Sequence, residues 1–198
     1  MHMETSVVEK LIRERRTIRQ FNGKPLAKET IMHLLEAAVW APVHSRKEPW
    51  RFILFVEEGR KQFADAVLHT FSKDERERWT EKLQKDYCES IQAHLLVVIE
   101  ADPRQRVWED AVGASAALIQ NIQLLAWEQD IGVVWKTNEY NFDPDFYFKT
   151  GVRPGERIIG TLHLGYFDQD KIPKPRPRTP AEELLTCVSV AGEDAQQH

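Results

Sequence analysis

Apolar side chains at helical spacing begin the chain. Four of them, from Val7 onward, fall on one face of a helix that we expect to run to about Arg15. A second set of apolar positions begins at Ile31 and predicts a helix that ends near Trp40, because Pro42 cannot continue it. The first forty residues therefore predict two helices joined by a polar turn.

Runs of β-branched and aromatic residues then predict four strands, at residues 50–56, 94–100, 131–135 and 157–166. His94 and His163 lie in two of these runs and are expected to be hydrogen-bonded core residues. A long, nearly apolar helix is expected at residues 107–129, and Asp143 with Pro144 predicts the start of a short helix. Because helices alternate with strands, periodicity alone predicts a parallel α/β sheet.

A charged stretch at residues 73–85 lies between the first two predicted strands. Its composition is typical of a solvated helix. Two interpretations stay open: an insertion that covers a pocket, or a surface helix with no further role.

Composition limits the function classes. The chain has 198 residues, and 42% hydrophobic content with 29% charge excludes wholesale disorder. A net charge of −4 argues against a protein that coats nucleic acid. The two cysteines, Cys88 and Cys187, lie far apart, which argues against a disulfide scaffold or a structural zinc site. Neither a signal-peptide pattern nor a bilayer-length apolar run is visible, so we expect a cytoplasmic protein without a membrane partner.

The motifs that carry chemistry are basic. GxGxxG after a strand, GxxxxGK[ST], HExxH and GxSxG are all missing, and we expect no metal site. Arg15, Arg16, Thr17 and Arg19 follow the first predicted helix, and guanidinium and hydroxyl groups together can bind phosphate oxygens. Taken alone, such a cluster is also typical of a solvated helix end that complements the helix dipole.

Two further segments favour a ligand with an anionic end and a flat aromatic end. The loop at residues 40–50 is dense in aromatic and polar groups and contains Trp40 and His44. The proline-rich arm at residues 173–180 cannot be a helix or a central strand. It carries two more cations, Arg176 and Arg178.

The order of these segments resembles the flavin-dependent (FMN) nitroreductase family, in its small single-domain branch. The matching motifs are RR[ST]xRxF from Arg15, APxHxxxxPWRF from Ala41 and Arg-x-Arg-x-Pro from Arg176. The likeness runs from Val7 to about Glu183.

The resemblance implies an FMN cofactor, with NADH or NADPH as electron donor, and it implies roles for eleven residues. The phosphate would be held by Arg15, Arg16, Thr17, Arg176 and Arg178. The flavin ring would lie near Arg19 and along the backbone of Trp135, Lys136 and Thr137. The FMN of a partner subunit would be reached by Trp40 and His44. The flavin itself accepts and delivers the hydride, so no catalytic side chain is expected.

Two positions depart from the family pattern. Glu48 stands where many relatives carry an amide, and a carboxylate disfavours the reduced flavin anion unless Arg46 or Lys47 pairs with it. Asn138 stands where larger relatives often carry glycine, which bears on how closely the backbone approaches the flavin.

The resemblance also implies an α+β fold, with a central, mixed, mostly antiparallel sheet flanked by helices. We follow it in preference to the parallel sheet. One FMN-binding domain is expected over residues 1–198, with an extended C-terminal arm from about residue 171. Residues 184–190 would add a strand to the sheet of a second copy, giving a homodimer with an exchanged tail.

Three functions follow as hypotheses. The first is an FMN oxidoreductase that takes a hydride from NADH or NADPH and reduces nitroaromatics, quinones or similar flat acceptors by a ping-pong mechanism. The second is a redox-inactive protein that binds or delivers flavin. The third is a protein that binds nucleic acid or another anionic partner through the cluster from Arg15 to Arg19. The resemblance favours the first.

Overall fold

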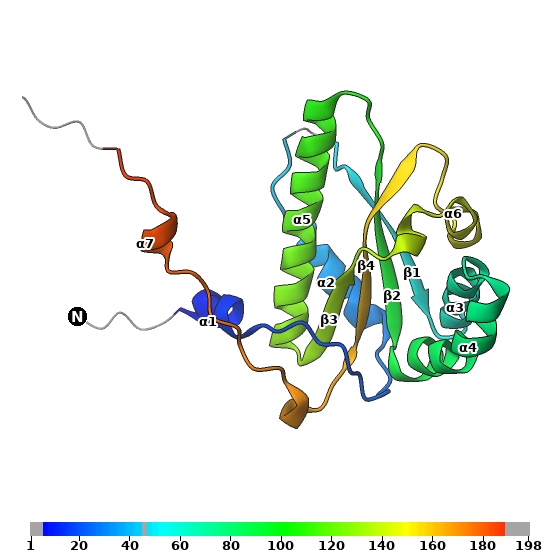
Figure 1. Cartoon of the computed structure of the whole chain (residues 1–198). Helices are drawn as coiled ribbons and strands as arrows, with labels where there is room; N and C mark the ends of the chain where they lie inside the picture. Colours follow the sequence, from blue (N-terminus) through cyan, green and yellow to red (C-terminus); the bar gives the residue numbers. More distant parts are fainter. Residues whose placement is uncertain (1–5, 45–46, 189–198) are drawn as a thin grey trace, which may run out of the picture.

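The computed structural model describes residues 6–44 and 47–188. Within them the chain forms one four-stranded sheet (Figure 1). Its strands are β1 (Trp50–Val56), β2 (Ala93–Glu100), β3 (Ile131–Lys136) and β4 (Glu156–Tyr166). Their order is β1-β2-β4-β3, and each neighbouring pair is antiparallel. All four strands lie within two residues of the predicted bounds.

The antiparallel sheet confirms the fold class that the resemblance implies, and the parallel sheet expected from periodicity alone is wrong. Within the described residues, parallel pairing is limited to an isolated bridge between Thr17 and Val133. The physical reason is burial: β2 is buried along almost its whole length, so it reads as a continuous apolar run. Such a run is also typical of a parallel strand, and it carries no information about strand direction.

Helices cover both faces of the sheet. On one face, α2 (Lys28–Ala38) and the long α5 (Gln105–Glu128) pack over apolar side chains such as Leu95 and Val97. On the other face, α3 (Gly59–His69) and α6 (Pro144–Thr150) pack around Phe63 and Phe146. The single sheet is thus buried between two helical layers.

Local sequence signals fix several helix ends. The charged stretch forms α4 (Lys73–Gln84), which begins with a reciprocal Ser72–Glu75 capping box, and a π-helix, η1 (Lys85–Ser90), follows it. Asp143 caps α6 by accepting from the backbone N–H groups of Asp145 and Phe146, with Pro144 at the first position as predicted. Short 3-10 turns, η2 (Glu139–Phe142) and η3 (Gln169–Lys171), follow β3 and β4.

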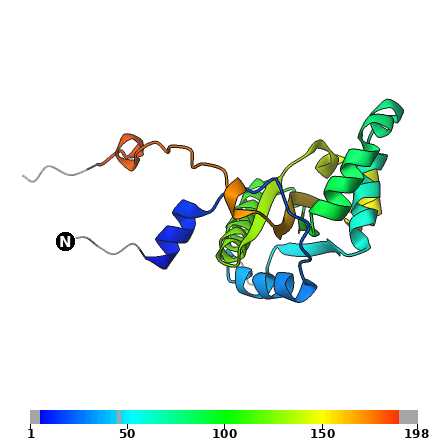
Figure 2. The same cartoon turned by 90° about the horizontal axis from the view of Figure 1, so that it is seen from below.

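Both ends of the described chain leave the sheet on the same side (Figures 1 and 2). α1 (Val7–Glu14) begins the chain there, and the C-terminal arm ends with α7 (Ala181–Leu184). The proline-rich segment is exposed and has no regular structure, as predicted. Of the strand expected at residues 184–190, Leu184 ends α7, residues 185–188 form no strand in the single chain, and the last two lie outside the described residues.

Candidate functional site

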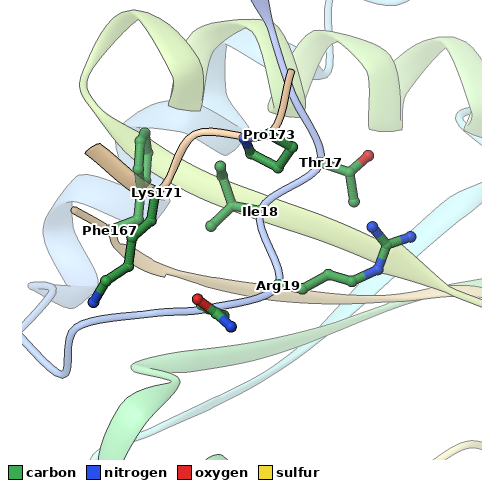
Figure 3. Close-up of a pocket in the computed structure, with 7 residues that line it drawn as sticks. Thr17, Ile18, Arg19, Phe167, Lys171 and Pro173 are labelled. Atoms are coloured by element: carbon green, nitrogen blue, oxygen red, sulfur yellow. The ribbon is translucent and has the colours of Figure 1, made fainter. Parts of the chain in front are cut away.

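A short extended segment after α1 presents the predicted cationic cluster. Thr17 bridges to Val133 of β3, and the Ile18 N–H donates to the Val133 carbonyl at 3.2 Å. Ile18 is buried at 3% exposure, while Thr17 and Arg19 extend to the opposite side of the segment (Figure 3). Alternation along an extended backbone therefore places Thr17 and Arg19 on one outward face.

This outward face and the C-terminal arm enclose a cavity of about 760 Å³, which we call the cationic groove. Its lining contains seven cations and, among the described residues, no carboxylate. The lining residues are Ile12, Arg13, Arg15, Arg16, Thr17, Arg19, Pro173, Lys174, Pro175, Arg176 and Arg178. Six of the predicted site residues are thus brought together: Arg15, Arg16, Thr17, Arg19, Arg176 and Arg178.

The arginines of the groove are close enough to repel one another. Burial, and then the charges of Arg16 and Arg178, lower the pKa of Arg15. Arg15 donates from Nη1 to Gln123 Oε1 of α5 at 3.2 Å, and Arg16 donates from Nη1 to the Arg13 carbonyl at 2.6 Å. The Nε atoms of Arg15 and Arg16 are buried and have no hydrogen-bond partner among the described residues. Buried donors without acceptors, on clustered cations, are groups that an anion would satisfy.

The end of β3 lies beside Arg19. Burial, and then the charge of Arg19, lower the pKa of Lys136, while Asp86 of η1 acts in the opposite direction. The Trp135 indole lies against β4, where its Nε1 donates to the Ile159 carbonyl at 3.4 Å and a Cβ at Gly160 would overlap it. Thr137 follows in an exposed position. Of the segment expected to line the flavin, Lys136 is close enough to feel the charge of Arg19, but none of its three residues lines the groove itself.

Trp40 and His44 lie apart from the cationic groove. The Trp40 side chain is 88% exposed, and His44 Nε2 is 3.7 Å from Asp110 Oδ1 of α5. His44 lines another cavity, of about 310 Å³. The single chain does not bring these two residues to the groove.

The loop before β1 also places Glu48. Its carboxylate accepts from the Trp50 indole Nε1 at 3.2 Å. Lys47 Nζ is 2.8 Å from a carboxylate oxygen of Glu100, and Arg46 lies outside the described residues. The indole of Trp50 is therefore a partner of Glu48 that sequence reasoning did not foresee.

Sequence reasoning missed other groups around the groove. Gln123 is buried in the apolar stretch of α5 and accepts from Arg15. A polar side chain within such a stretch was the available signal. Asp86 had no such signal, because only the fold of η1 brings it near Lys136.

Comparison with known proteins agrees with this fold. The model of the nitroreductase family matches residues 12–166. The chain belongs to the nitroreductase family. This membership confirms the predicted resemblance and the expectation of an oxidoreductase enzyme.

Similar proteins extend over nearly the whole chain. "Putative NAD(P)H nitroreductase YfhC" of Bacillus subtilis is 38% identical over 184 residues, covering 91% of this chain and 94% of that protein. A nitroreductase-like family protein from Bacillus cereus is 39% identical, with a TM-score of 0.87 over 96% of this chain and 100% of that one.

A more distant structure shares the fold. It is a "putative nitroreductase in complex with FMN" from Desulfovibrio desulfuricans, with 21% identity and a TM-score of 0.70 over 94% of this chain and 99% of that one. Within the described part of this nitroreductase, no helix is long and apolar enough to cross a membrane.

Proposed function

We propose that this nitroreductase binds FMN in the cationic groove, takes a hydride from NADH or NADPH, and reduces nitroaromatics, quinones or similar flat acceptors by a ping-pong mechanism. The observation that carries the proposal is a groove lined by seven cations, in which the Nε atoms of Arg15 and Arg16 have no partner among the described residues. A phosphate monoester carries about two charges and several acceptor oxygens, which suits this donor set. The names of relatives that include NAD(P)H or FMN support the same assignment.

The residues in and beside the groove would have different roles in binding FMN. Arg15, Arg16 and Arg178 surround the position for the phosphate, and the Thr17 hydroxyl adds a donor beside them. When bound, FMN supplies the hydride chemistry at its ring. Arg19 lies at the far end of the cluster from Arg15, and Lys136 of β3 lies near it. These two cations would favour the negative charge of the reduced ring.

The complete site is proposed to need two chains. Trp40 and His44 lie on the loop before β1, outside the groove of their own chain. In a homodimer this loop would reach the groove of the partner, as the resemblance implies. Each FMN-binding domain, with its C-terminal arm, would then complete the site of the other.

The first prediction tests the groove. Arg16→Ala combined with Arg178→Ala should lower FMN affinity about 100-fold or more, since each charge-assisted hydrogen bond contributes about 1.5–3 kcal/mol. The matched control is Lys28→Ala with Arg157→Ala, which removes the same charge at exposed positions away from the groove. Isothermal titration of FMN into the stripped protein measures the effect, and mass spectrometry identifies the released chromophore. Unchanged affinity in the first variant, or FAD as the native chromophore, would contradict the proposal.

A spectrum separates oxidoreductase from flavin carrier. The yellow colour of the purified protein should bleach when NADH or NADPH is added under argon. A chain that holds FMN but keeps its colour with both donors would favour the redox-inactive alternative. A colourless chain that also fails to bind added FMN would favour the third hypothesis, a protein that binds another anionic partner.

A further inference from the structure

Two buried polar side chains form a pair beside the end of β3. Asn141 of η2 is 1% exposed and Thr161 of β4 is 0% exposed. The Thr161 hydroxyl donates to Asn141 Oδ1 at 2.8 Å, and Thr161 lies opposite Lys136 in the antiparallel pairing of β3 with β4. Burying an amide and a hydroxyl costs free energy unless both are hydrogen-bonded. The pair is therefore a specific feature of this end of the sheet.

Asn141 holds the turn that follows β3 at two points. Its Nδ2 donates to the Lys136 carbonyl at 3.2 Å, and its backbone N–H donates to the Asn138 carbonyl at 2.9 Å. Because a carbonyl can only accept, the amide nitrogen of Asn141 must face Lys136 and its amide oxygen must face Thr161. The Thr161 hydroxyl therefore fixes the side chain that holds the last residue of β3, and the Asn141 backbone holds the residue two positions later.

This turn begins at Lys136, which lies near Arg19. Thr17 and Val133 form a parallel bridge, so the chain continues from Thr17 through Arg19 along the free edge of β3 toward Lys136. Burial, and then the charge of Arg19, lower the pKa of Lys136. Repulsion between two neighbouring cations favours any movement that separates them. The hydrogen bond from Asn141 to the Lys136 carbonyl opposes such a movement of the strand end.

We propose that Asn141 and Thr161 are positioning residues that hold Lys136 near Arg19, where the two cations favour the reduced form of the bound flavin. The inference rests on the proposed function, because it concerns the same FMN site. Neither Asn141 nor Thr161 lines the cationic groove, so their effect passes through Lys136. Losing the pair should shift the balance between oxidised and reduced flavin more than it weakens binding of oxidised FMN, which depends on the phosphate contacts.

Two substitutions of Thr161 separate positioning from packing. Thr161→Val keeps the shape and leaves the Asn141 side chain without its donor, whereas Thr161→Ser keeps the hydroxyl and removes a methyl group. The flavin midpoint potential of each FMN-loaded variant is measured against a reference dye under argon. Thr161→Val should lower the preference for reduced flavin about tenfold, a fall of about 30 mV for a two-electron couple. Thr161→Ser should keep the native potential, although both variants lose stability.

Thr150→Val is the matched control. Thr150 is 3% exposed, and its hydroxyl donates to the Phe146 carbonyl at 2.6 Å within α6 rather than to the turn after β3. The same replacement of a hydroxyl by a methyl group should lower the melting temperature and leave the flavin potential unchanged. A fall in potential of equal size in the Thr150 variant, or an unchanged potential in Thr161→Val, would overturn the proposal.

Lys136→Met tests whether the effect passes through the lysine. This substitution removes the charge, so adding Thr161→Val to it should change the potential little further. A full additional fall would overturn the role assigned to Lys136. Asn141→Ala loses the same support of the strand end and should show the same fall in potential, which keeps the test decisive if Thr161→Val does not fold.

Hydrogen exchange of the stripped protein gives a readout that needs no flavin. The backbone N–H of Asn141 should exchange faster in Thr161→Val than in Thr161→Ser, because the turn is held less firmly. Faster exchange with an unchanged potential would show that the pair is structural only. A native chain that binds no FMN would overturn this inference together with the proposed function. FMN that is bound and is reduced by NADH or NADPH, with a native potential in Thr161→Val, would overturn this inference alone.

Discussion

At the scale of single residues, the contacts of two buried histidines in the sheet indicate which of their ring nitrogens carry protons. His94 Nε2 faces the Tyr87 carbonyl at 2.9 Å, and His94 Nδ1 lies 2.7 Å from His163 Nδ1. A carbonyl only accepts, so His94 carries its proton on Nε2, and His163 must donate from Nδ1. The remaining nitrogen, His163 Nε2, is buried and has no partner among the described residues. Burial lowers the pKa of both rings, so both are neutral near pH 7 in the folded chain.

This pair predicts acid sensitivity. Burial lowers the pKa of His94 to about 3, and burial together with His94 lowers the pKa of His163 well below its usual 6.5. Below pH 6.5 the unfolded chain binds protons that the folded chain excludes, so stability falls as the pH drops toward 3. Each histidine contributes a slope of up to about 1.4 kcal/mol per pH unit.

Urea unfolding between pH 7.5 and 4.5 measures this slope. His163→Gln should reduce stability at pH 7.5 and also flatten the pH dependence, because one excluded proton is gone. His33→Gln, at an exposed position on α2, should keep the full slope. A slope in the His163 variant equal to that of the native chain would show that other groups cause the acid sensitivity.

The sequence predicted the chemistry of single residues better than it predicted the contacts between residues. The cluster from Arg15 to Arg19 and the arm residues Arg176 and Arg178 could be named as candidate anion-binding residues from their type, and the family resemblance supplied their expected role at a phosphate. The sequence could not predict that His94 pairs with His163, or that Lys136 lies near Arg19. Those contacts depend on which strands are neighbours, which a single sequence does not state.

At the scale of elements, Gly132 of β3 allows the segment that carries Thr17, Ile18 and Arg19 to pack closely against this strand. A Cβ at Gly132 would lie 2.7 Å from Ile18 Cβ, closer than packed side chains allow. Gly132→Ala should therefore displace Ile18, destabilise the fold by about 1–3 kcal/mol and weaken FMN binding through the shifted Thr17 and Arg19. Gly113 on α5 has open space around it, and Gly113→Ala should stabilise by about 0.5–1 kcal/mol.

Chemical denaturation and FMN titration of both glycine variants check these effects. The stripped protein is used for denaturation, so that loss of FMN does not lower the apparent stability. Tight FMN binding by the Gly132 variant at reduced stability would separate the packing of Ile18 from the geometry of the groove. An unchanged stability would show that the bridge from Thr17 to Val133 can shift at no cost.

Elements were largely predictable, and their arrangement was not. Apolar runs marked the strands because each buries apolar or β-branched side chains, and Asp143 with Pro144 marked the start of α6 because capping is local. These apolar runs did not indicate the direction of each strand in the sheet. Between β1 and β2 the chain includes α3, α4 and η1, a connection long enough to return in either direction. The resemblance supplied the antiparallel sheet.

At the scale of the whole molecule, the single chain leaves apolar surface exposed at both ends. Val7 and Val8 of α1 are 68% and 61% exposed, and Leu184, Leu185 and Val188 of the arm are at least 70% exposed. Exposed apolar side chains grouped in this way are typical of surfaces that a partner covers. A second copy of the chain is the partner proposed above, because the family resemblance implies that Trp40 and His44 reach the FMN of another chain.

If each chain completes the FMN site of the other, dimerisation and FMN binding are linked. Each must then strengthen the other by the same free energy. Sedimentation of the FMN-loaded protein should therefore show dissociation at a lower concentration than sedimentation of the stripped protein. Ending the chain after Pro180 should weaken the dimer, because the expected strand at residues 184–190 is lost, whereas a chain that ends after Val190 keeps that strand and should dimerise normally. A monomer that remains yellow and active on dilution would refute both the exchanged tail and the shared site.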